Sequence, residues 1–137
     1  MKITTDKEDI LLANEAKRAM EKAYAPYSGF HVGAALLTRE GKVYTGCNIE
    51  NASYPATCCA ERTAIFKAVS EGEKYFSKIA IAGGKNGNIT SICYPCGICR
   101  QVMSEFFGKD SEILLINEKD EVYSYKLCEL LPYSFEM

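Results

Sequence analysis

Three cysteines at two predicted helix starts constrain the fold of this chain more than any other feature of its sequence. Cys59 opens one predicted helix, while Cys96 and Cys99 lie in the first turn of another, where their spacing places both side chains on one face. Backbone N–H groups at a helix N-terminus stabilise negative charge, and thiolate is the form that binds zinc. Three thiolates would leave the fourth position of a tetrahedral zinc ion open, as in catalytic rather than structural sites.

Glu61 completes the pattern because it lies shortly after Cys59, at the same predicted helix start. Zinc lowers the pKa of bound water to about 7, and a carboxylate beside that water can take its proton and pass it to a substrate. Cys-x-Glu followed by Pro-Cys-x-x-Cys matches the signature of zinc nucleobase deaminases. We therefore predict that Cys59, Cys96 and Cys99 bind zinc and that Glu61 carries protons between the water and the base.

The remaining cysteines keep a structural zinc site open as an alternative. The chain has seven cysteines, and those outside the predicted site are Cys47, Cys58, Cys93 and Cys128. A four-cysteine site would recruit Cys58 or Cys93, and Cys93 forms a competing Cys-x-x-Cys pair with Cys96. However, Cys93 precedes Pro95 and so lies outside the helix start, and Cys58 adjoins Cys59 and should point elsewhere. We expect the four to pack as small apolar side chains.

Composition limits the class of protein. With 137 residues, 47% of them hydrophobic and 25% charged, the chain has the size and balance of one globular domain spanning residues 1–137. A net charge of −2 without a run of Lys and Arg argues against a nucleic-acid partner, which needs a basic face. No apolar stretch approaches the roughly 20 residues that span a bilayer, and the first residues lack the apolar core of a secretory signal. We expect a cytoplasmic protein without a membrane partner, a setting that favours metal binding over disulfides.

Apolar periodicity predicts an α/β fold with elements in the order α-β-β-α-β-α-β-β. Helices are expected over residues 5–23, capped by Thr4 or Thr5, over 59–71, from Pro95 onward, and as a last turn over 128–131. The five expected strands are residues 30–37, 42–49, 78–82, 112–116 and 122–126. Such an order indicates a mixed sheet with helices on its faces. The connection 117–121 is too short for a parallel crossover, so the last two strands should pair antiparallel.

Three segments resemble the small homotetrameric zinc-dependent cytidine deaminases. They are residues 47–54 (CNIENASY), 59–64 (CAERTA) and 95–102 (PCGICRQV). Residues 30–36 and the tail 130–135 are also similar to that family, so the resemblance covers about residues 8–135. It implies a three-layer α/β/α cytidine deaminase-like fold, one Zn²⁺ per subunit and a homotetramer with shared active sites. It also implies hydrolysis of free cytidine or deoxycytidine to uridine or deoxyuridine and ammonia, in pyrimidine salvage.

The resemblance assigns the nucleoside-binding residues. It implies that Asn48 and Glu50 bind the ribose hydroxyls, which agrees with a strand, where residues two apart face the same way. It further implies that Phe30 packs against the nucleoside and that the backbone near Ala60 holds the pyrimidine carbonyl.

Further roles come from the same resemblance. The backbone of Tyr94 would receive the exocyclic amine, and Phe135 of a neighbouring subunit would stack on the base. Arg62 would donate hydrogen bonds to the thiolates, which offsets the net charge of −1 that three thiolates and Zn²⁺ carry together. Tyr94 stands where the family has Ser or Thr, and Cys58 where a small apolar residue is usual. These two departures put the rim of the pocket and the choice of metal ligands in question.

Three competing functions remain. A polynucleotide-editing deaminase shares the zinc motif, but the near-neutral charge and the short 117–121 connection oppose it, since a helix separates the last two strands in such relatives and makes them parallel. A deaminase of a nucleoside antibiotic is not expected to carry the segment 48–54. A non-enzymatic zinc module predicts four protein ligands on the metal.

Overall fold

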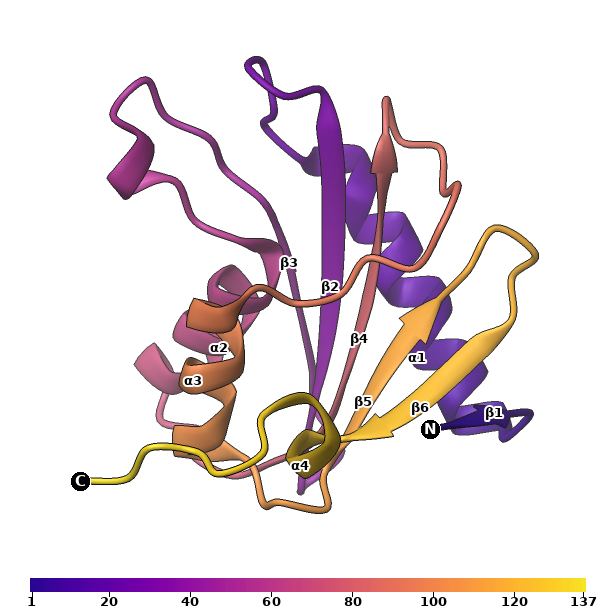
Figure 1. The fold of residues 1–137 in the computed structure, drawn as a ribbon, viewed down its shortest axis with the longest axis vertical. Helices are drawn as coiled ribbons and strands as arrows, with labels where there is room; N and C mark the ends of the chain where they lie inside the picture. Colours follow the sequence, from indigo (N-terminus) through magenta and orange to yellow (C-terminus); the bar gives the residue numbers. More distant parts are fainter.

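A six-stranded mixed sheet forms the centre of the computed structural model, which describes all residues, 1–137 (Figure 1). Its strands, in spatial order, are β1 (Lys2–Thr4), β6 (Val122–Lys126), β5 (Glu112–Ile116), β4 (Phe76–Lys85), β2 (Phe30–Thr38) and β3 (Val43–Cys47). Strands β4 and β5 run parallel, and the other neighbouring pairs run antiparallel. The predicted antiparallel pairing of the last two strands is confirmed by the register from Glu112 opposite Lys126 to Ile116 opposite Val122.

The prediction of five strands was wrong, because β1 adds a sixth at the edge of the sheet. This strand has only three residues, and Thr4 is the buried one, so it is too short to display the alternation by which strands are recognised. Its pairing is supplied by β6, from the other end of the chain. The predicted cap of the first helix was also wrong. Asp6 caps it by accepting from the backbone N–H of Glu8 and Asp9, while the Thr4 hydroxyl donates to the Asp9 carboxylate.

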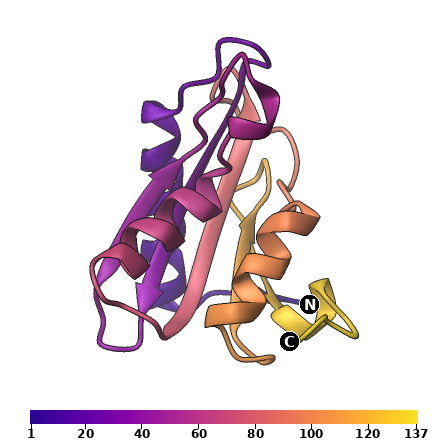
Figure 2. The same cartoon turned by 90° about the vertical axis from the view of Figure 1, so that its left-hand side faces the viewer.

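Helices cover both faces of the sheet, which gives three layers (Figures 1 and 2). One face carries α1 (Lys7–Ala19) with the short η1 (Met20–Lys22), and the other carries α2 (Ala60–Ser70), α3 (Gly97–Phe106) and the short α4 (Leu127–Leu130). A further single turn, η2 (Tyr54–Ala56), lies in the loop between β3 and α2. Successive residues of the central strands alternate between two cores. Ile79 and Ile81 pack with α2 and α3, while Ala80 and Ala82 pack with α1. The molecule has no helix long and apolar enough to cross a membrane.

Close packing against β3 fixes where α2 begins. A Cβ atom at Gly46 would lie 2.6 Å from the carbonyl oxygen of Ala60 and 2.5 Å from the backbone nitrogen of Ala64, so only glycine permits this approach. The first turn of α2 is therefore pressed onto the end of β3. This contact fixes the position of Cys59, the residue before Ala60, which lies next to Cys96 at the start of α3.

Candidate active site

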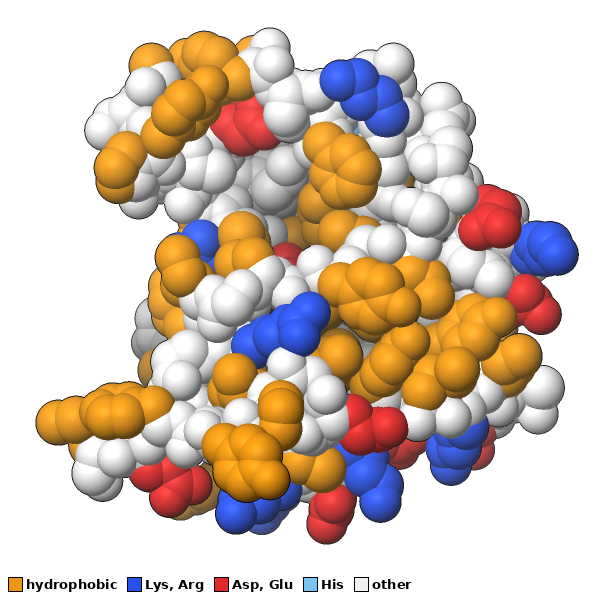
Figure 3. All heavy atoms as spheres, in the orientation of Figure 1, with side chains coloured by type: hydrophobic (Ala, Val, Ile, Leu, Met, Phe, Trp, Pro, Cys, Tyr) orange, Lys and Arg blue, Asp and Glu red, His pale blue; other side chains and the backbone are white.

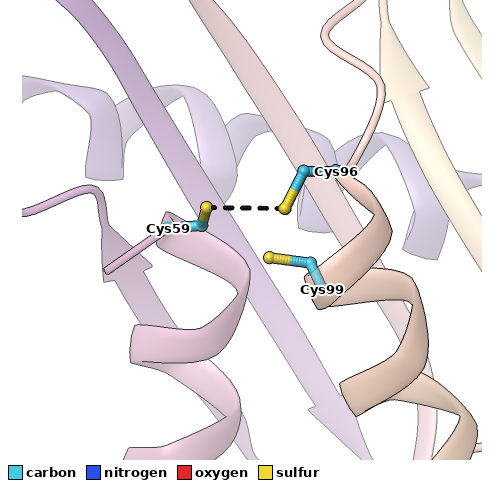
Figure 4. A group of neighbouring side chains, drawn as sticks. All are labelled: Cys59, Cys96 and Cys99. Atoms are coloured by element: carbon cyan, nitrogen blue, oxygen red, sulfur yellow. Dashed lines mark hydrogen bonds between the residues drawn. The ribbon is translucent and has the colours of Figure 1, made fainter. Parts of the chain in front are cut away.

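The starts of α2 and α3 meet, and their cysteines form a cluster (Figure 4). Cys59 is the N-cap of α2, Cys96 is the N-cap of α3, and Cys99 lies in the first turn of α3. The three sulfur atoms lie within 4.8 Å of one another. The sequence predicted these residues as one metal site, and the fold brings them together from positions far apart in the chain.

The spacing of the sulfurs fits a zinc ion. Two thiolates that each lie about 2.3 Å from a tetrahedral zinc ion are roughly 3.8 Å apart. The sulfurs of Cys59 and Cys96 are 3.8 Å apart. A trio of thiolates is also a soft donor set of the kind that zinc accepts, and it supplies three of four ligands. The cluster is therefore positioned to bind a metal ion and to leave one coordination position for a small molecule.

The thiols of this cluster share protons unevenly. Hydrogen bonding from Cys99 and from Arg62, together with Cys96, lowers the pKa of Cys59 to about 5 although burial opposes it. The pKa of Cys99 is raised, because its thiol donates to the Cys59 sulfur and because it is buried. Nη2 of Arg62 lies 3.4 Å from the Cys59 sulfur, as a donor to a thiolate should. A metal ion takes the place of the shared proton when it binds.

Glu61 lies in the first turn of α2, with only 3% of its surface exposed. Burial raises the pKa of Glu61 to about 7, and the charge of Cys59 adds to this effect. The backbone N–H of Glu61 itself, Cys99 and Arg62 act in the opposite direction. A carboxyl group in this range can both hold and release a proton near neutral pH. The structure thus places an acid–base group at the same helix start as Cys59.

The other cysteines lie outside the cluster. Cys93 packs against β4, where a Cβ at Gly83 would come 2.9 Å from its sulfur, and burial raises its pKa to about 12. Cys93 is not among the side chains whose ligand atoms lie close enough together to share one metal ion. The sulfur of Cys58 accepts a hydrogen bond from the Thr63 hydroxyl at 3.6 Å. The group of side chains close enough to hold one metal ion consists of the three predicted cysteines.

The two residues predicted to bind ribose lie just beyond β3, not on it. The strand ends at Cys47, where the chain leaves the sheet, so the expected strand over 42–49 was too long at this end. Oδ1 of Asn48 accepts from the backbone N–H of Val32 at 2.9 Å, and its Nδ2 donates to the carbonyl of Phe30 at 2.8 Å. Asn48 is buried and fixes the start of β2.

Glu50 fixes the loop that leads into β2. Its carboxylate accepts from the backbone N–H groups of Tyr27 and Ser28, at 2.9 and 3.1 Å, and from the Ser28 hydroxyl. The hydrogen bond from the Ser28 side chain, with those from the backbone, lowers the pKa of Glu50. Asn48 and Glu50 therefore hold the segment before Phe30 in place. The surface is hollowed beside the lobe formed by residues 48–57 (Figure 3).

The remaining predicted residues differ in exposure. Ala60 is fully buried at the start of α2, whereas the rings of Phe30 and Tyr94 are 39% and 51% exposed. The hydroxyl of Tyr94 lies 3.1 Å from that of Tyr125 on β6. Phe135 is 66% exposed in the C-terminal tail, which passes the end of α3 opposite to the metal cluster (Figure 1). Within one chain, the structure does not bring Phe135 to the cysteines.

Three contacts of this region, made by two side chains, have no signal in the sequence. Arg100 donates to the carbonyls of Pro95 and Leu130, and Tyr125 meets Tyr94 across the space between β6 and the turn before α3. No local pattern reveals these contacts, because the partners of Arg100 are backbone carbonyls and the partner of Tyr125 is a tyrosine distant in sequence.

The comparisons with known proteins agree with this geometry. Residues 6–114 match the family model for the cytidine and deoxycytidylate deaminase zinc-binding region. This chain belongs to that family. A cytidine deaminase of Sporosarcina psychrophila is 47% identical over 124 residues, which cover 90% of this chain and 88% of the relative. A cytidine deaminase of Halalkalibacterium halodurans is 47% identical over 125 residues, covering 91% and 92%.

Solved structures of this deaminase family have the same fold. The cytidine deaminase of Burkholderia pseudomallei superposes with a TM-score of 0.83 at 47% identity and covers 91% of this chain and 97% of its own. That of Mycobacterium tuberculosis gives a TM-score of 0.80 at 38% identity, with coverage of 96% and 100%. The family assignment identifies zinc as the metal for which Cys59, Cys96 and Cys99 are positioned.

Proposed function

We propose that this chain hydrolyses free cytidine and deoxycytidine to uridine and deoxyuridine plus ammonia, with one zinc ion per subunit. The observation that carries the proposal is the convergence of three cysteine sulfurs within 4.8 Å at the helix start that also holds buried Glu61. Membership of the deaminase family and the names of its relatives support cytidine as the substrate.

Cys59, Cys96 and Cys99 hold the metal in this proposal. Zinc, when bound, supplies a hydrolytic nucleophile at neutral pH because it lowers the pKa of bound water to about 7. Arg62 donates to the Cys59 sulfur and so offsets the surplus negative charge of three thiolates. A less negative ligand set makes the bound water more acidic.

Glu61 moves both protons of the reaction. It takes the first proton from the attacking water and passes it to N3 of cytosine while the oxygen adds to C4, the site of attack in this class of enzyme. It then carries the proton of the new C4 hydroxyl to the exocyclic amine. The C4–N bond breaks, ammonia leaves, and the C4 carbonyl of uracil forms. Because Glu61 is buried, bulk water has little access to its carboxyl group between the two transfers.

In this proposal the hollow beside the lobe of residues 48–57 receives the nucleoside. In this proposal Asn48 and Glu50 bind the ribose hydroxyls through the hydrogen-bonding capacity left over after they fix the entry to β2. The ring of Phe30 packs against the nucleoside, the backbone near Ala60 holds the pyrimidine carbonyl, and the backbone carbonyl of Tyr94 accepts from the exocyclic amine.

Assembly completes the site in this proposal. Residues 1–137 form one deaminase domain, and four copies form a homotetramer in which Phe135 of a neighbouring subunit stacks on the base. The exposure of the Phe135 ring supports this role, because an exposed aromatic ring is stabilised when a contact with another molecule removes it from water. The role in pyrimidine salvage and the cytoplasmic location stay predictions.

The test is the ultraviolet spectrum of cytidine incubated with the purified protein, beside a sample stripped of metal by a chelator. We expect conversion to uridine that disappears on stripping and returns with added zinc. A folded, zinc-loaded protein that leaves cytidine unchanged would refute the proposal. If the same sample deaminated single-stranded DNA or RNA, the polynucleotide alternative would replace it.

A further inference from the structure

Arg100 joins two parts of the molecule that the proposed mechanism uses separately. Its Nε donates to the backbone carbonyl of Pro95, and its Nη1 donates to the backbone carbonyl of Leu130, both at 2.7 Å. Pro95 comes immediately before Cys96, and Leu130 is the last residue of α4, where the C-terminal tail begins. The side chain of Arg100 is half-buried between these two partners.

The chemistry of arginine suits a link of this kind. The guanidinium group is planar, always charged, and holds its N–H donors in a fixed fork. Two carbonyls that bind the same guanidinium therefore cannot move independently of one another. Lysine carries its donors on one flexible ammonium group, which lacks the geometry to hold both carbonyls at once.

The neighbouring residue extends the link along the tail. Nε2 of Gln101 donates to the backbone carbonyl of Phe135 at 3.3 Å. Two consecutive residues of α3 thus hold the C-terminal segment, one at its root and one near its end. The N-terminal turn of the same helix carries Cys96 and Cys99, and Figures 1 and 2 both place α4 and the tail beside α3.

We propose that Arg100 is a positioning residue that couples the turn carrying Cys96 to the root of the C-terminal tail. The proposal rests on the proposed function, in which Cys96 binds zinc and the tail delivers Phe135 to a neighbouring site. Without the guanidinium, the Pro95 carbonyl loses its partner and the turn before Cys96 is free to shift. The same change releases the end of α4, so that the tail no longer leaves the molecule in one direction.

The test compares four variants of the full chain by two measurements. The rate of zinc release to a chromogenic chelator reports on the turn that carries Cys96. The rate of cleavage by chymotrypsin at Tyr133 and Phe135 reports on the tail. Arg100→Met removes both hydrogen bonds, Arg100→Lys keeps the charge, and Gln101→Ala removes only the contact to Phe135. Arg39→Met is the control, because this arginine lies over the ring of Tyr75, 5.4 Å from its centroid, in a different part of the fold.

We expect Arg100→Met to release zinc about tenfold faster than the original chain, at the lower end of the range for groups that orient metal ligands. Its tail should also be cut faster, and the KM for cytidine should rise. Arg100→Lys should fall between this variant and the original chain. Gln101→Ala should accelerate tail cleavage and leave zinc release unchanged, and the Arg39→Met control should match the original chain in both measurements.

A folded Arg100→Met variant that releases zinc at the original rate would overturn the proposal, even if its melting temperature fell. Faster zinc release from Gln101→Ala would also overturn the proposal, because the tail rather than Arg100 would then hold the turn that carries Cys96. If Arg100→Met does not fold, Arg100→Lys decides between the same outcomes. Cytidine turnover by the original chain is measured in parallel. An original chain that binds zinc without turnover would refute the proposed function, while the comparison of zinc release would still decide the role of Arg100.

Discussion

The metal end and the nucleoside end of the candidate site are built in different ways. At the metal end, side chains from two helix starts converge, with three sulfurs within 4.8 Å and Glu61 buried beside them in α2. At the proposed nucleoside end, the side chains assigned to the substrate come from loops, from the start of β2 and, from a neighbouring subunit, from the tail. Their aromatic rings remain exposed, at 39% for Phe30, 51% for Tyr94 and 66% for Phe135.

This difference indicates which part of the reaction one chain can support alone. The reactive groups are fixed by helix geometry and by packing of α2 on β3, so they are in place before a substrate arrives. The aromatic rings assigned to the nucleoside are exposed in a single chain, which is consistent with the proposed contribution of a neighbouring subunit. Substitutions at the metal end should therefore abolish activity, whereas those at the nucleoside end should weaken binding.

The largest effect should come from the metal ligands. Cys99→Ala removes a buried sulfur of the cluster, and we expect loss of bound zinc and turnover below detection. Cys93→Ala is the matched control, since this half-buried thiol packs against β4 outside the cluster. It should keep zinc and activity and lose only stability. Metal analysis by atomic emission and the cytidine assay check both, and zinc loss from Cys93→Ala would revive the four-cysteine structural site.

Glu61→Gln should have the next largest effect, because it removes the proton carrier but keeps the shape of the side chain. We expect turnover of cytidine to fall about 10²- to 10⁴-fold, the usual contribution of general acid–base catalysis, with zinc still bound. Steady-state kinetics and metal content check this, with Glu71→Gln at the other end of α2 as the control. Near-normal turnover of a zinc-loaded Glu61→Gln variant would contradict the assignment.

The same division governs what the sequence could predict. The metal end follows from local signals, since a cysteine at a helix N-cap, a glutamate shortly after it and a Pro-Cys-x-x-Cys turn are visible in short windows. The strand pattern also predicted five of the six strands, and a short connection predicted the antiparallel pairing of β5 and β6. Only the proximity of the two helix starts in space could not be predicted without the fold.

The features that the sequence did not reveal depend on distant partners. Strand β1 is defined by β6, and Tyr94 is held by Tyr125. Arg100 binds a backbone carbonyl of Leu130, and such an acceptor has no signature in the sequence because every residue carries one. Asn48 showed the reverse problem. Its side chain was predicted to bind the substrate, and in the structure it forms hydrogen bonds to the backbone of β2. Residue type alone does not distinguish these two roles.

A smaller effect is expected at the proposed intersubunit contact. Stacking of a base on an aromatic side chain contributes about 1–3 kcal/mol, so Phe135→Ala should raise the KM for cytidine roughly 5- to 150-fold. The metal end is independent of this ring, so zinc content should not change. Tyr133→Ala, at an exposed position of the same tail, is the control. Kinetics over a range of cytidine concentrations check the prediction, and a fall in turnover number with unchanged KM would place Phe135 in a different role.

The smallest effect should come from Tyr125→Phe. This substitution tests the role of its partner Tyr94, which adjoins the metal end and is assigned to the nucleoside end. Tyr94 precedes the turn to Cys96 and belongs to the proposed nucleoside end, and its hydroxyl lies 3.1 Å from that of Tyr125. Removing one hydroxyl while keeping the edge-to-face ring contact should lower the free energy of unfolding by about 0.5–1.5 kcal/mol. Because the proposed substrate contact of Tyr94 is its backbone carbonyl, KM and turnover should stay within about twofold of the original values.

Denaturant unfolding and cytidine kinetics measure the two quantities, with Tyr123→Phe on the same strand as the control. A Tyr125→Phe variant with unchanged stability but a raised KM would mean that the tyrosine pair shapes the substrate pocket directly. The side chain of Tyr94 would then be part of the nucleoside end. A tyrosine in place of Ser or Thr at this position would alter substrate binding rather than the position of the turn before Cys96.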